Sequence, residues 1–430
     1  MGSTTEKDQQ FTWHPFTHLK YAESPINITR TEGSYYYSED GTKIIDAISS
    51  WWVNLHGHCH PYISQKITEQ LCTNEHSIFS GFTHPGAVEL AERILQHLPA
   101  NQQRIFYSDD GSTSVEVALK MALQYWHNKG EARKLIIAFE NAYHGDTFGG
   151  MSVGARNAFN NAFSPLLFDV VHVPLPAFNE EEFYFEQFEK ILSHHPVAAF
   201  IFEPLVQGAA GMLMYKEEHL DRLMAICKKH SVITIADEVM TGFGRTGHFF
   251  ASNVLHHKPD IVCLSKGLTG GYMPLGITSC AGFIYDAFIC DEKEKTFFHG
   301  HSYTANPIAC AAALASLDLM EKPETWDNIK RINEQHIAFF RFFHEFYPNV
   351  VCRIRGTIIA IDVPGRENRH YLNPLAENIS GFFIKKNILI RPLGNVLYLI
   401  PPYCISKDDL QYIYDAIAEY FGLLDVSIEI

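Results

Sequence analysis

Apolar residues in the middle of the chain alternate between two patterns. Short, wholly apolar runs without a polar alternation predict strands that are buried on both faces. These runs lie at 104–107, 134–139, 197–202, 232–236 and 261–265. Between them, residues 112–129 and 219–230 carry apolar side chains at the three-and-four spacing of an amphipathic helix. The order predicts an α/β fold with a mostly parallel central sheet covered by helices.

The two ends of the chain show a different pattern. Residues 26–48 predict short strands with a turn at Glu39-Asp40-Gly41. The C-terminal part predicts a helix at 325–346, short strands near 351–363 and 396–400, and a last helix at 407–421. We therefore expect a large domain over 59–310. Residues 1–58 and 311–430 would together form a smaller α+β domain.

Composition excludes several classes of protein. The chain has 430 residues, of which 46% are hydrophobic and 19% charged, which is typical of a soluble globular protein. The net charge of −15 argues against a nucleic-acid partner. The polar residues 1–8 lead us to expect no signal peptide. No run of about 18 apolar residues occurs, so no membrane span is expected. Nine cysteines without a Cys-x-x-Cys pair favour a reduced, cytoplasmic protein.

Two charged residues stand at the ends of predicted strands. Lys266 follows the apolar run 261–265, and Asp237 ends the run that begins at Val232. A partly desolvated lysine loses its proton readily and becomes a nucleophile. Pyridoxal phosphate (PLP) chemistry requires such a lysine for the aldehyde and an acid that keeps the pyridine nitrogen protonated. A buried Asp-Lys ion pair is the alternative interpretation.

Two further segments lie where a strand ends. Ser108-Asp109-Asp110-Gly111-Ser112-Thr113-Ser114 leads into the helix at 112 and could present backbone amides to a phosphate, or could simply cap the helix. Tyr143, in Asn141-Ala142-Tyr143-His144-Gly145-Asp146, could stack on a planar cofactor or could be a half-buried turn residue.

Two motifs have a well-known literal interpretation that we do not favour. Gly242, Gly244 and Gly247 form a G-x-G-x-x-G pattern, which would suggest an NAD(P)-dependent oxidoreductase. No convincing helix starts at the third glycine, so a dinucleotide site is not expected. His56-Gly57-His58-Cys59-His60 does not have the ligand spacing of a zinc site, so no metal is expected.

Aromatic and cationic residues outside the central region suggest a substrate pocket. Trp51 and Trp52 are adjacent and should point to opposite sides, so that one of them could line an apolar pocket. Arg391 stands alone in an apolar strand-like segment. It could bind a substrate carboxylate through both nitrogens, or it could form a structural ion pair.

Together these motifs resemble those of the class III, or ω-amino-acid, aminotransferases of PLP fold type I, nearly from end to end. The resemblance rests on Asp237-Glu238, on Gly242 to Gly247 and on Ser265-Lys266-Gly267, which have the order and spacing of the class signature. Further matching segments are Trp13-His14-Pro15-Phe16-Thr17, Ser49-Ser50-Trp51-Trp52, Met121-Ala122-Leu123-Gln124-Tyr125-Trp126, His299-Gly300-His301-Ser302-Tyr303 and Ile390-Arg391-Pro392-Leu393-Gly394.

The resemblance implies a role for each matching residue. Lys266 would hold the cofactor as a Schiff base and move the proton, Asp237 would pair with the pyridine nitrogen, and Tyr143 would lie on the ring. Gly111 and Ser112 would bind the phosphate. Gly300, His301 and Ser302 would reach the cofactor or substrate of a second subunit, which implies a homodimer with shared active sites. Phe16, Trp51, Trp52, Tyr143, Gly300 and Arg391 would surround the substrates.

The resemblance also implies a reaction. Its motifs are closest to those of family members that convert 8-amino-7-oxononanoate to 7,8-diaminononanoate in biotin biosynthesis. S-adenosylmethionine is the favoured amino donor. Many members have tyrosine where this chain has Phe16, and phenylalanine keeps the ring but loses the hydroxyl. A lysine-dependent form of the reaction, or another ω-amino-acid aminotransferase, therefore remains an alternative.

Overall fold

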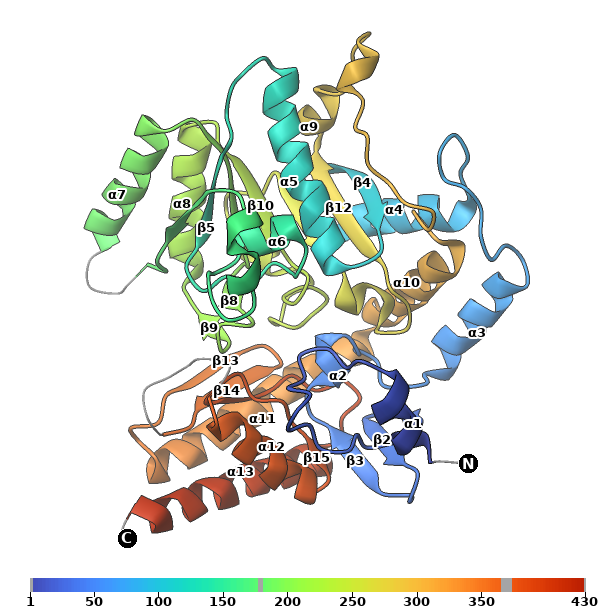
Figure 1. Ribbon diagram of the computed structural model, residues 1–430, viewed down its shortest axis with the longest axis vertical. Coiled ribbons are helices and arrows are strands. Elements are labelled where there is room, and N and C mark those ends of the chain that lie inside the picture. Colours follow the sequence, from blue (N-terminus) through green and yellow to red (C-terminus); the bar gives the residue numbers. More distant parts are fainter. Residues whose placement is uncertain (1–2, 177–180, 365–372, 429–430) are drawn as a thin grey trace.

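A computed structural model describes residues 3–176, 181–364 and 373–428 of the chain. Its centre is a sheet of seven strands (Figure 1). In spatial order they are β4 (Gln102–Ser108), β12 (Gly276–Ala281), β11 (Ile261–Leu264), β10 (Ile233–Asp237), β7 (Val197–Phe202), β5 (Leu135–Phe139) and β6 (Val170–Val173). All neighbours are parallel except β12, which is antiparallel to both β4 and β11. The expected mostly parallel sheet is confirmed.

Successive residues along a strand of this sheet pack into two separate cores, one on each face. Ile136 and Ala138 of β5 join the core that α5 (Gly111–Asn128) covers, whereas Ile137 and Phe139 point into the larger core on the opposite face. Side chains on a strand alternate between faces, so strands covered on both sides are apolar throughout. That is why these runs lack a polar alternation in the sequence.

The other helices surround this sheet and extend the large core. α4 (Pro85–His97) packs on β4, and α8 (Glu217–Lys229) packs on β10 and on α7 (Glu181–His194). α10 (Pro307–Met320) contacts α3 (Pro61–Leu71), α4 and the short helix η3 (Lys266–Thr269). The remaining short elements here are α6 (Phe148–Val153), η1 (Asn161–Leu166), β8 (Val206–Gln207), β9 (Leu213–Met214), η2 (Ala251–Val254), α9 (Gly282–Asp286) and η4 (Lys293–Lys295).

Both ends of the chain contribute to a second, smaller layer of structure, below the large sheet in Figure 1. β15 (Ile388–Leu389) pairs in parallel with β3 (Lys43–Asp46), which continues through β2 (Tyr35–Ser38) to β1 (Ile28–Glu32). A three-stranded antiparallel sheet lies beside it, made of β13 (Cys352–Arg355), β14 (Ile358–Asp362) and β16 (Val396–Leu399). The helices are α1 (Thr4–Phe11), α2 (Ser49–Trp52), α11 (Pro323–Phe346), α12 (Leu375–Lys385) and α13 (Lys407–Ile428).

This pairing of the two ends gives the smaller α+β part that the sequence predicts. The exact boundaries at 58/59 and 310/311 stay predictions. Within the described ranges, no helix is both long enough and apolar enough to cross a bilayer.

Candidate active site

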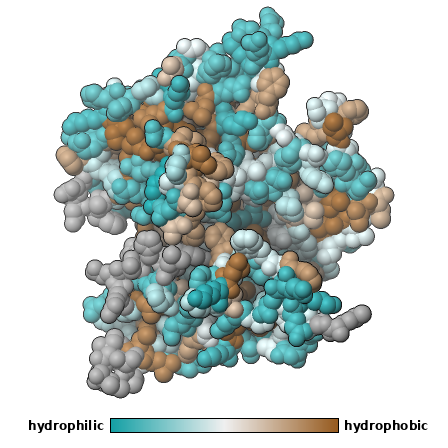
Figure 2. Space-filling view, viewed as in Figure 1, coloured by the Kyte–Doolittle hydropathy of each residue, from teal (hydrophilic) through white to brown (hydrophobic). Residues whose placement is uncertain are grey.

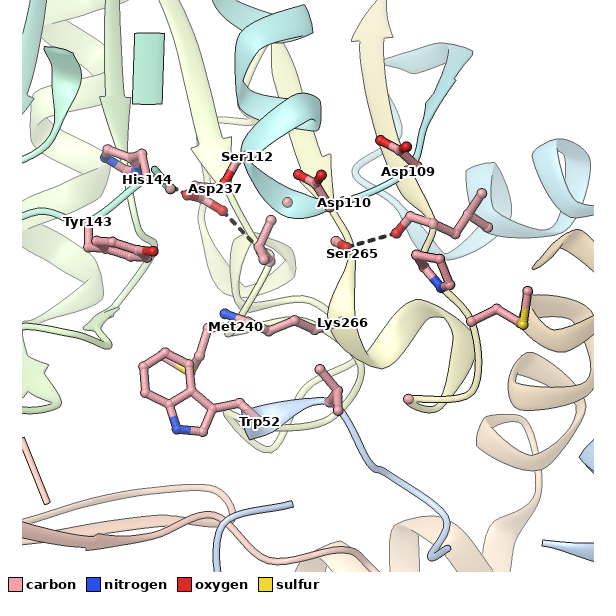
Figure 3. A pocket seen from close by; sticks show the side chains of 18 of the residues that line it. Trp52, Asp109, Asp110, Ser112, Tyr143, His144, Asp237, Met240, Ser265 and Lys266 are labelled. Atoms are coloured by element: carbon pink, nitrogen blue, oxygen red, sulfur yellow. Dashed lines mark hydrogen bonds and ion pairs between the residues drawn. The ribbon is translucent and has the colours of Figure 1, made fainter. Parts of the chain in front are cut away.

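A cavity of about 460 Å³ lies at the carboxyl edge of the large sheet (Figure 3). Lys266 follows β11, Asp237 ends β10, Glu203 follows β7 and Tyr143 lies in the segment after β5. All four residues line the cavity. Parallel strands bring their carboxyl ends to one edge, and ligands of α/β proteins bind there. The sheet topology therefore brings together residues that are far apart in the sequence.

Lys266 is the buried amine of this cavity. Its Nζ lies 4.6 Å from the ring centroid of Trp52, and its backbone has a positive φ of 44°. Burial lowers the pKa of Lys266 to about 8, although the negative charges of Asp237 and Glu203 act in the opposite direction. A substantial fraction of the amine is therefore neutral near pH 8 and able to act as a nucleophile.

Asp237 is held in place by two hydrogen bonds. Its Oδ2 lies 2.7 Å from Nδ1 of His144, and its Oδ1 accepts from the backbone N–H of Val239 at 3.1 Å. The side chain of His144 is fully buried, so the imidazole cannot turn away without breaking the contact. A carboxylate fixed in this way can face a cationic ring nitrogen in one orientation.

The N-terminus of α5 forms another wall of the cavity. Asp110 caps the helix by accepting from the backbone N–H of Thr113 at 2.8 Å, and Gly111 and Ser112 line the cavity. The first amides of a helix have no partner within the helix and attract anions. A Cβ on Gly111 would lie 2.7 Å from Cγ1 of Val239, so the turn fits only a residue without a side chain.

A chain of aromatic rings runs from the cavity to its mouth. The ring centroid of Tyr143 lies 6.4 Å from that of Phe159, which lies 5.8 Å from Phe16. Phe16 contacts Trp51 at 5.3 Å, and Cζ of Arg391 lies 4.5 Å from the Trp51 ring. The predicted residues Phe16, Trp51 and Arg391 are thus brought together, next to the cavity and not in its lining.

The predicted residues Gly300, His301 and Ser302 are not part of the cavity lining in this chain. They lie in a loop before α10, and Nε2 of His301 is 3.8 Å from a carboxylate oxygen of Asp109. Asp109 does line the cavity. The loop therefore approaches the rim of the site without entering it.

Two residues of the site were missed by the sequence-based prediction. His144 stands beside the predicted Tyr143, but nothing in its spacing indicates a contact with Asp237. Glu203 could have been predicted from the sequence, because it directly follows an apolar strand. Asp237 was predicted from the same kind of position, at the end of an apolar strand. It accepts the backbone N–H groups of Tyr143 at 3.2 Å and Gly208 at 2.8 Å. Burial, with a further contribution from the charge of Asp237, raises the pKa of Glu203 to about 7.

The glycine motif does not form a dinucleotide site. Residues Gly242 to Gly247 form turns, and the next element is the four-residue helix η2. Within the motif, the buried guanidinium of Arg245 donates to the backbone carbonyls of Trp52, Asn54 and Pro401 at 2.9–3.3 Å. The motif thus supports the backbone next to the site.

The histidine-rich segment also has a structural role. His56 is buried with Nε2 3.1 Å from the hydroxyl of Ser316, and burial lowers the pKa of His56 to about 3. Nε2 of His58 lies 2.9 Å from Asp46. No group of three or more metal-ligating side chains occurs among the residues described.

The cavity offers a buried amine, a fixed carboxylate and helix amides around one space. An aldehyde that bonds to an amine, a pyridine nitrogen that requires an acid and a phosphate that binds helix amides occur together in PLP. Gly111 and Ser112, in the first turn of α5, line the same cavity as Lys266 and Asp237. Fold and cavity therefore define a class, the PLP-dependent transferases of fold type I.

Comparison with known proteins identifies the family. Residues 17–421 match the family model described as aminotransferase class III. The chain is 47% identical over 416 residues to the adenosylmethionine-8-amino-7-oxononanoate aminotransferase of Synechococcus elongatus, covering 95% of this chain and 97% of the relative. The corresponding enzyme of Geobacter sulfurreducens is 37% identical, with 95% of each chain covered. This chain belongs to the class III aminotransferases, which are PLP-dependent.

Solved structures agree with this assignment. The adenosylmethionine-8-amino-7-oxononanoate aminotransferase of Methanocaldococcus jannaschii superposes with a TM-score of 0.92 at 35% identity, covering 97% of this chain and 98% of that one. A PLP-bound amine transaminase from an uncultivated Pseudomonas species superposes with a TM-score of 0.89 at 31% identity, covering 96% and 98%. Members with different amine substrates therefore share the fold, and the substrate must be inferred from the pocket.

Proposed function

We propose that this chain transfers an amino group from S-adenosylmethionine to 8-amino-7-oxononanoate, forming 7,8-diaminononanoate in biotin biosynthesis. The names of relatives up to 47% identical over nearly the whole chain support this reaction. The observation that carries the proposal is the cluster of Arg391, Trp51 and Phe16 beside the cavity. It supplies a cation for a carboxylate and apolar surfaces for an alkyl chain.

The geometry of the cavity supports a role in cofactor binding for each of the following residues. Lys266 would bind the aldehyde, Asp237 would face the pyridine nitrogen, and the amides of Gly111 and Ser112 would bind the phosphate. Bound PLP supplies an electron sink for the carbon that gains or loses the amino group. His144 keeps Asp237 in one orientation, with Nδ1 2.7 Å from the carboxylate.

Lys266 would be the residue that transfers the proton. Its pKa of about 8 lets Nζ take up and release a proton near neutral pH, as general acid–base catalysis requires. Glu203, with a pKa of about 7, is the second group of the cavity that can change its charge in this range. The ring of Trp52 covers the ammonium form of Lys266 at 4.6 Å and so favours it, because an aromatic face attracts a cation.

The acceptor would bind with its carboxylate on Arg391. An arginine can bind a carboxylate through two parallel hydrogen bonds, and stacking on Trp51 restricts the plane of the guanidinium. The keto carbon would then lie towards Lys266. This arrangement selects an acceptor with a carboxylate at one end and the reacting carbonyl several bonds away.

The rings at the mouth favour S-adenosylmethionine over lysine. Phe16, Phe159 and Trp51 present aromatic faces, on which an adenine can stack. A sulfonium is a cation without N–H groups, and aromatic faces bind such cations well. The lysine side chain ends in a compact, strongly hydrated ammonium that requires hydrogen-bond acceptors, which a phenylalanine ring does not provide.

We further propose a cytoplasmic homodimer. The loops at 72–84 and 297–303 lie together, since the rings of His76 and Tyr303 are 5.5 Å apart. They expose Ile78, Phe82, Phe298 and Tyr303, and apolar side chains gather over the loop that follows α3 at the right of Figure 2. A second subunit would cover this surface, and its Gly300, His301 and Ser302 segment would reach the neighbouring cavity.

None of the nine cysteines forms a disulfide within the described ranges, which is consistent with a reducing compartment.

The reaction is tested with purified protein reconstituted with PLP. 8-Amino-7-oxononanoate is supplied with S-adenosylmethionine, lysine, glutamate or alanine in separate reactions, and 7,8-diaminononanoate is measured by mass spectrometry. We expect product only with S-adenosylmethionine, and none from the Lys266→Ala variant. If lysine gives product and S-adenosylmethionine does not, the assignment of S-adenosylmethionine as the amino donor is wrong. If no donor gives 7,8-diaminononanoate but the protein converts another keto acid, the assignment of 8-amino-7-oxononanoate as the acceptor is wrong.

A further inference from the structure

The two tryptophans at the site extend from an unusually shaped turn. Ser49, Ser50 and Trp52 have φ angles of 54°, 61° and 67°, in the left-handed region that residues with a Cβ rarely adopt. This turn, α2, lies at the junction between the large sheet and the smaller part of the molecule (Figure 1). Such a backbone persists only where its surroundings hold it in place.

A buried carboxylate holds the turn from one side. The Asp46 side chain, at the end of β3, is fully buried, and its Oδ1 accepts from the backbone N–H of Ile48 at 3.1 Å. Its Oδ2 accepts from the N–H of Ser50 at 2.7 Å and lies 2.9 Å from Nε2 of His58. Nδ1 of His58 in turn lies 3.1 Å from the side-chain amide of Asn54, just beyond the turn.

The turn fixes the direction of both indole rings. Trp52 donates its Nε1–H to the hydroxyl of Tyr398 at 2.9 Å and covers Lys266. Trp51 points the other way, against Arg391 and Phe16. Because the two residues are adjacent, any change in φ and ψ at Ser50 would move both rings at once.

We propose that Asp46, bonded to His58, is a positioning residue that sets the orientation of Trp51 and Trp52 and thereby the specificity for the acceptor. Neither Asp46 nor His58 lines the cavity. Asp46 therefore acts through the turn, by accepting two of its N–H groups. The inference rests on the proposed function, because it takes the Trp51–Arg391 pair as the carboxylate pocket.

The first test is a double-mutant cycle. Asp46→Asn replaces one acceptor oxygen by an NH₂ group, which cannot accept an N–H. We expect the KM for 8-amino-7-oxononanoate to rise about tenfold, since the loss corresponds to roughly one charge-assisted hydrogen bond. The Kd for PLP should stay within about twofold. In a Trp51→Ala background, Asp46→Asn should change the KM less than about twofold, because the ring that Asp46 positions is already absent.

Two further variants separate positioning from general stability. His58→Leu removes the N–H donor and should raise the KM for 8-amino-7-oxononanoate. His58→Gln keeps an N–H donor, so its KM should stay closer to that of the wild-type protein. Asp260→Asn is a matched control at the opposite edge of the sheet, where Asp260 accepts from the N–H and the hydroxyl of Thr234 at 2.9 Å each. It should leave the KM unchanged. Equal effects of Asp46→Asn with and without Trp51, or a similar KM change in Asp260→Asn, would refute the positioning role.

A structural measurement makes the inference independent of the substrate. The chain has five tryptophans, so 5-fluorotryptophan gives five ¹⁹F resonances, which Trp→Phe variants assign. Asp46→Asn should shift the resonances of Trp51 and Trp52 and leave those of Trp126 and Trp326 in place. If the rings shift but wild-type protein does not accept 8-amino-7-oxononanoate, the proposed function fails and the positioning role stands. If the rings do not shift, the positioning role fails, whatever the substrate.

Discussion

The chemistry of Lys266 depends on where the fold buries it. In the cofactor-free protein, its amine should be acetylated by acetic anhydride with a half-maximal rate near pH 8, because burial lowers its pKa to about that value. Exposed Lys66 is the internal control, since its hydrogen bond to Glu69 raises the pKa above the usual 10.5. Competitive isotope labelling followed by peptide mass spectrometry measures both lysines in one sample. Identical pH profiles would contradict the assigned environment.

Asp237 should matter more for turnover than for cofactor binding. Asp237→Asn leaves a neutral amide that cannot stabilise a protonated ring nitrogen, so kcat should fall by about 100-fold or more. Hydrogen bonds to the phosphate and the covalent bond to Lys266 would remain. Steady-state kinetics and the visible absorbance of bound PLP measure the two effects separately. Near-normal kcat at full occupancy would rule out this role.

Arg391 should affect the acceptor and not the cofactor. Arg391→Ala should weaken the half-reaction with 8-amino-7-oxononanoate by about 1.5–3 kcal/mol, the scale of a hydrogen bond to a charged group. Arg391→Lys should restore little, because an ammonium lacks the planar fork and stacks poorly on Trp51. Single-turnover kinetics of each half-reaction give the comparison. A lower melting temperature with an unchanged acceptor KM would indicate a structural ion pair instead.

Part of this site could be predicted from the sequence because strand ends are visible in it. Lys266, Asp237 and Tyr143 follow apolar runs, and parallel strands bring such positions to one edge. The contact between Phe16, Trp51 and Arg391 could not be derived from spacing, since it depends on how both ends of the chain fold over the large sheet. His144 was missed because its only signal is a hydrogen bond in three dimensions.

At the level of elements, the N-terminus of α5 tolerates little added volume. Gly111→Ala would place a Cβ 2.7 Å from Val239, and the first turn of the helix would have to move. We expect the Kd for PLP to rise by about tenfold, the lower part of the usual 1–3 kcal/mol penalty for overpacking. Fluorescence titration of cofactor-free protein measures this Kd.

Gly381→Ala is the matched control for that substitution. Gly381 lies inside α12, and a Cβ there would meet no atom within 4 Å. Alanine should raise the free energy of unfolding by about 0.5–1 kcal/mol, since glycine in a helix interior is destabilising by that amount. PLP binding should not change. If both variants lost the cofactor equally, local crowding at Gly111 would not be the cause.

Element length alone did not decide which elements were predicted, since the four-residue β11 was predicted and the 14-residue helices α7 and α10 were not. The predicted strand at 197–202 is β7 without a shift, and the predicted helix at 112–129 is α5 displaced by one residue. β12 and β6 were missed, since each carries polar residues among the apolar ones, and β6 has only four residues. β15 has only two residues, so its pairing with β3 has no periodicity to detect.

At the scale of the whole molecule, the proposed dimer makes a direct prediction. Wild-type protein should sediment at about 98 kDa, twice the chain mass of 48.9 kDa. Phe82→Glu should produce monomers, because it places a charge on the apolar surface that the partner would cover. Phe342→Glu is the control, an exposed phenylalanine on α11. Sedimentation velocity would contradict the dimer if wild-type protein were monomeric, or the interface if both variants behaved alike.

The pairing of β3 with β15 also sets an order of events during synthesis. Ile45 pairs with Ile388, so more than three hundred residues leave the ribosome between the two partners. At 5–20 residues per second that interval lasts roughly 20–70 s. The seven strands of the large sheet all lie between Gln102 and Ala281 and can assemble during the wait. We therefore expect nascent chains to assemble the sheet edge that carries Lys266 and Asp237 first, and to bring Arg391 to Trp51 and Tyr398 to Trp52 only when the C-terminal part has been made.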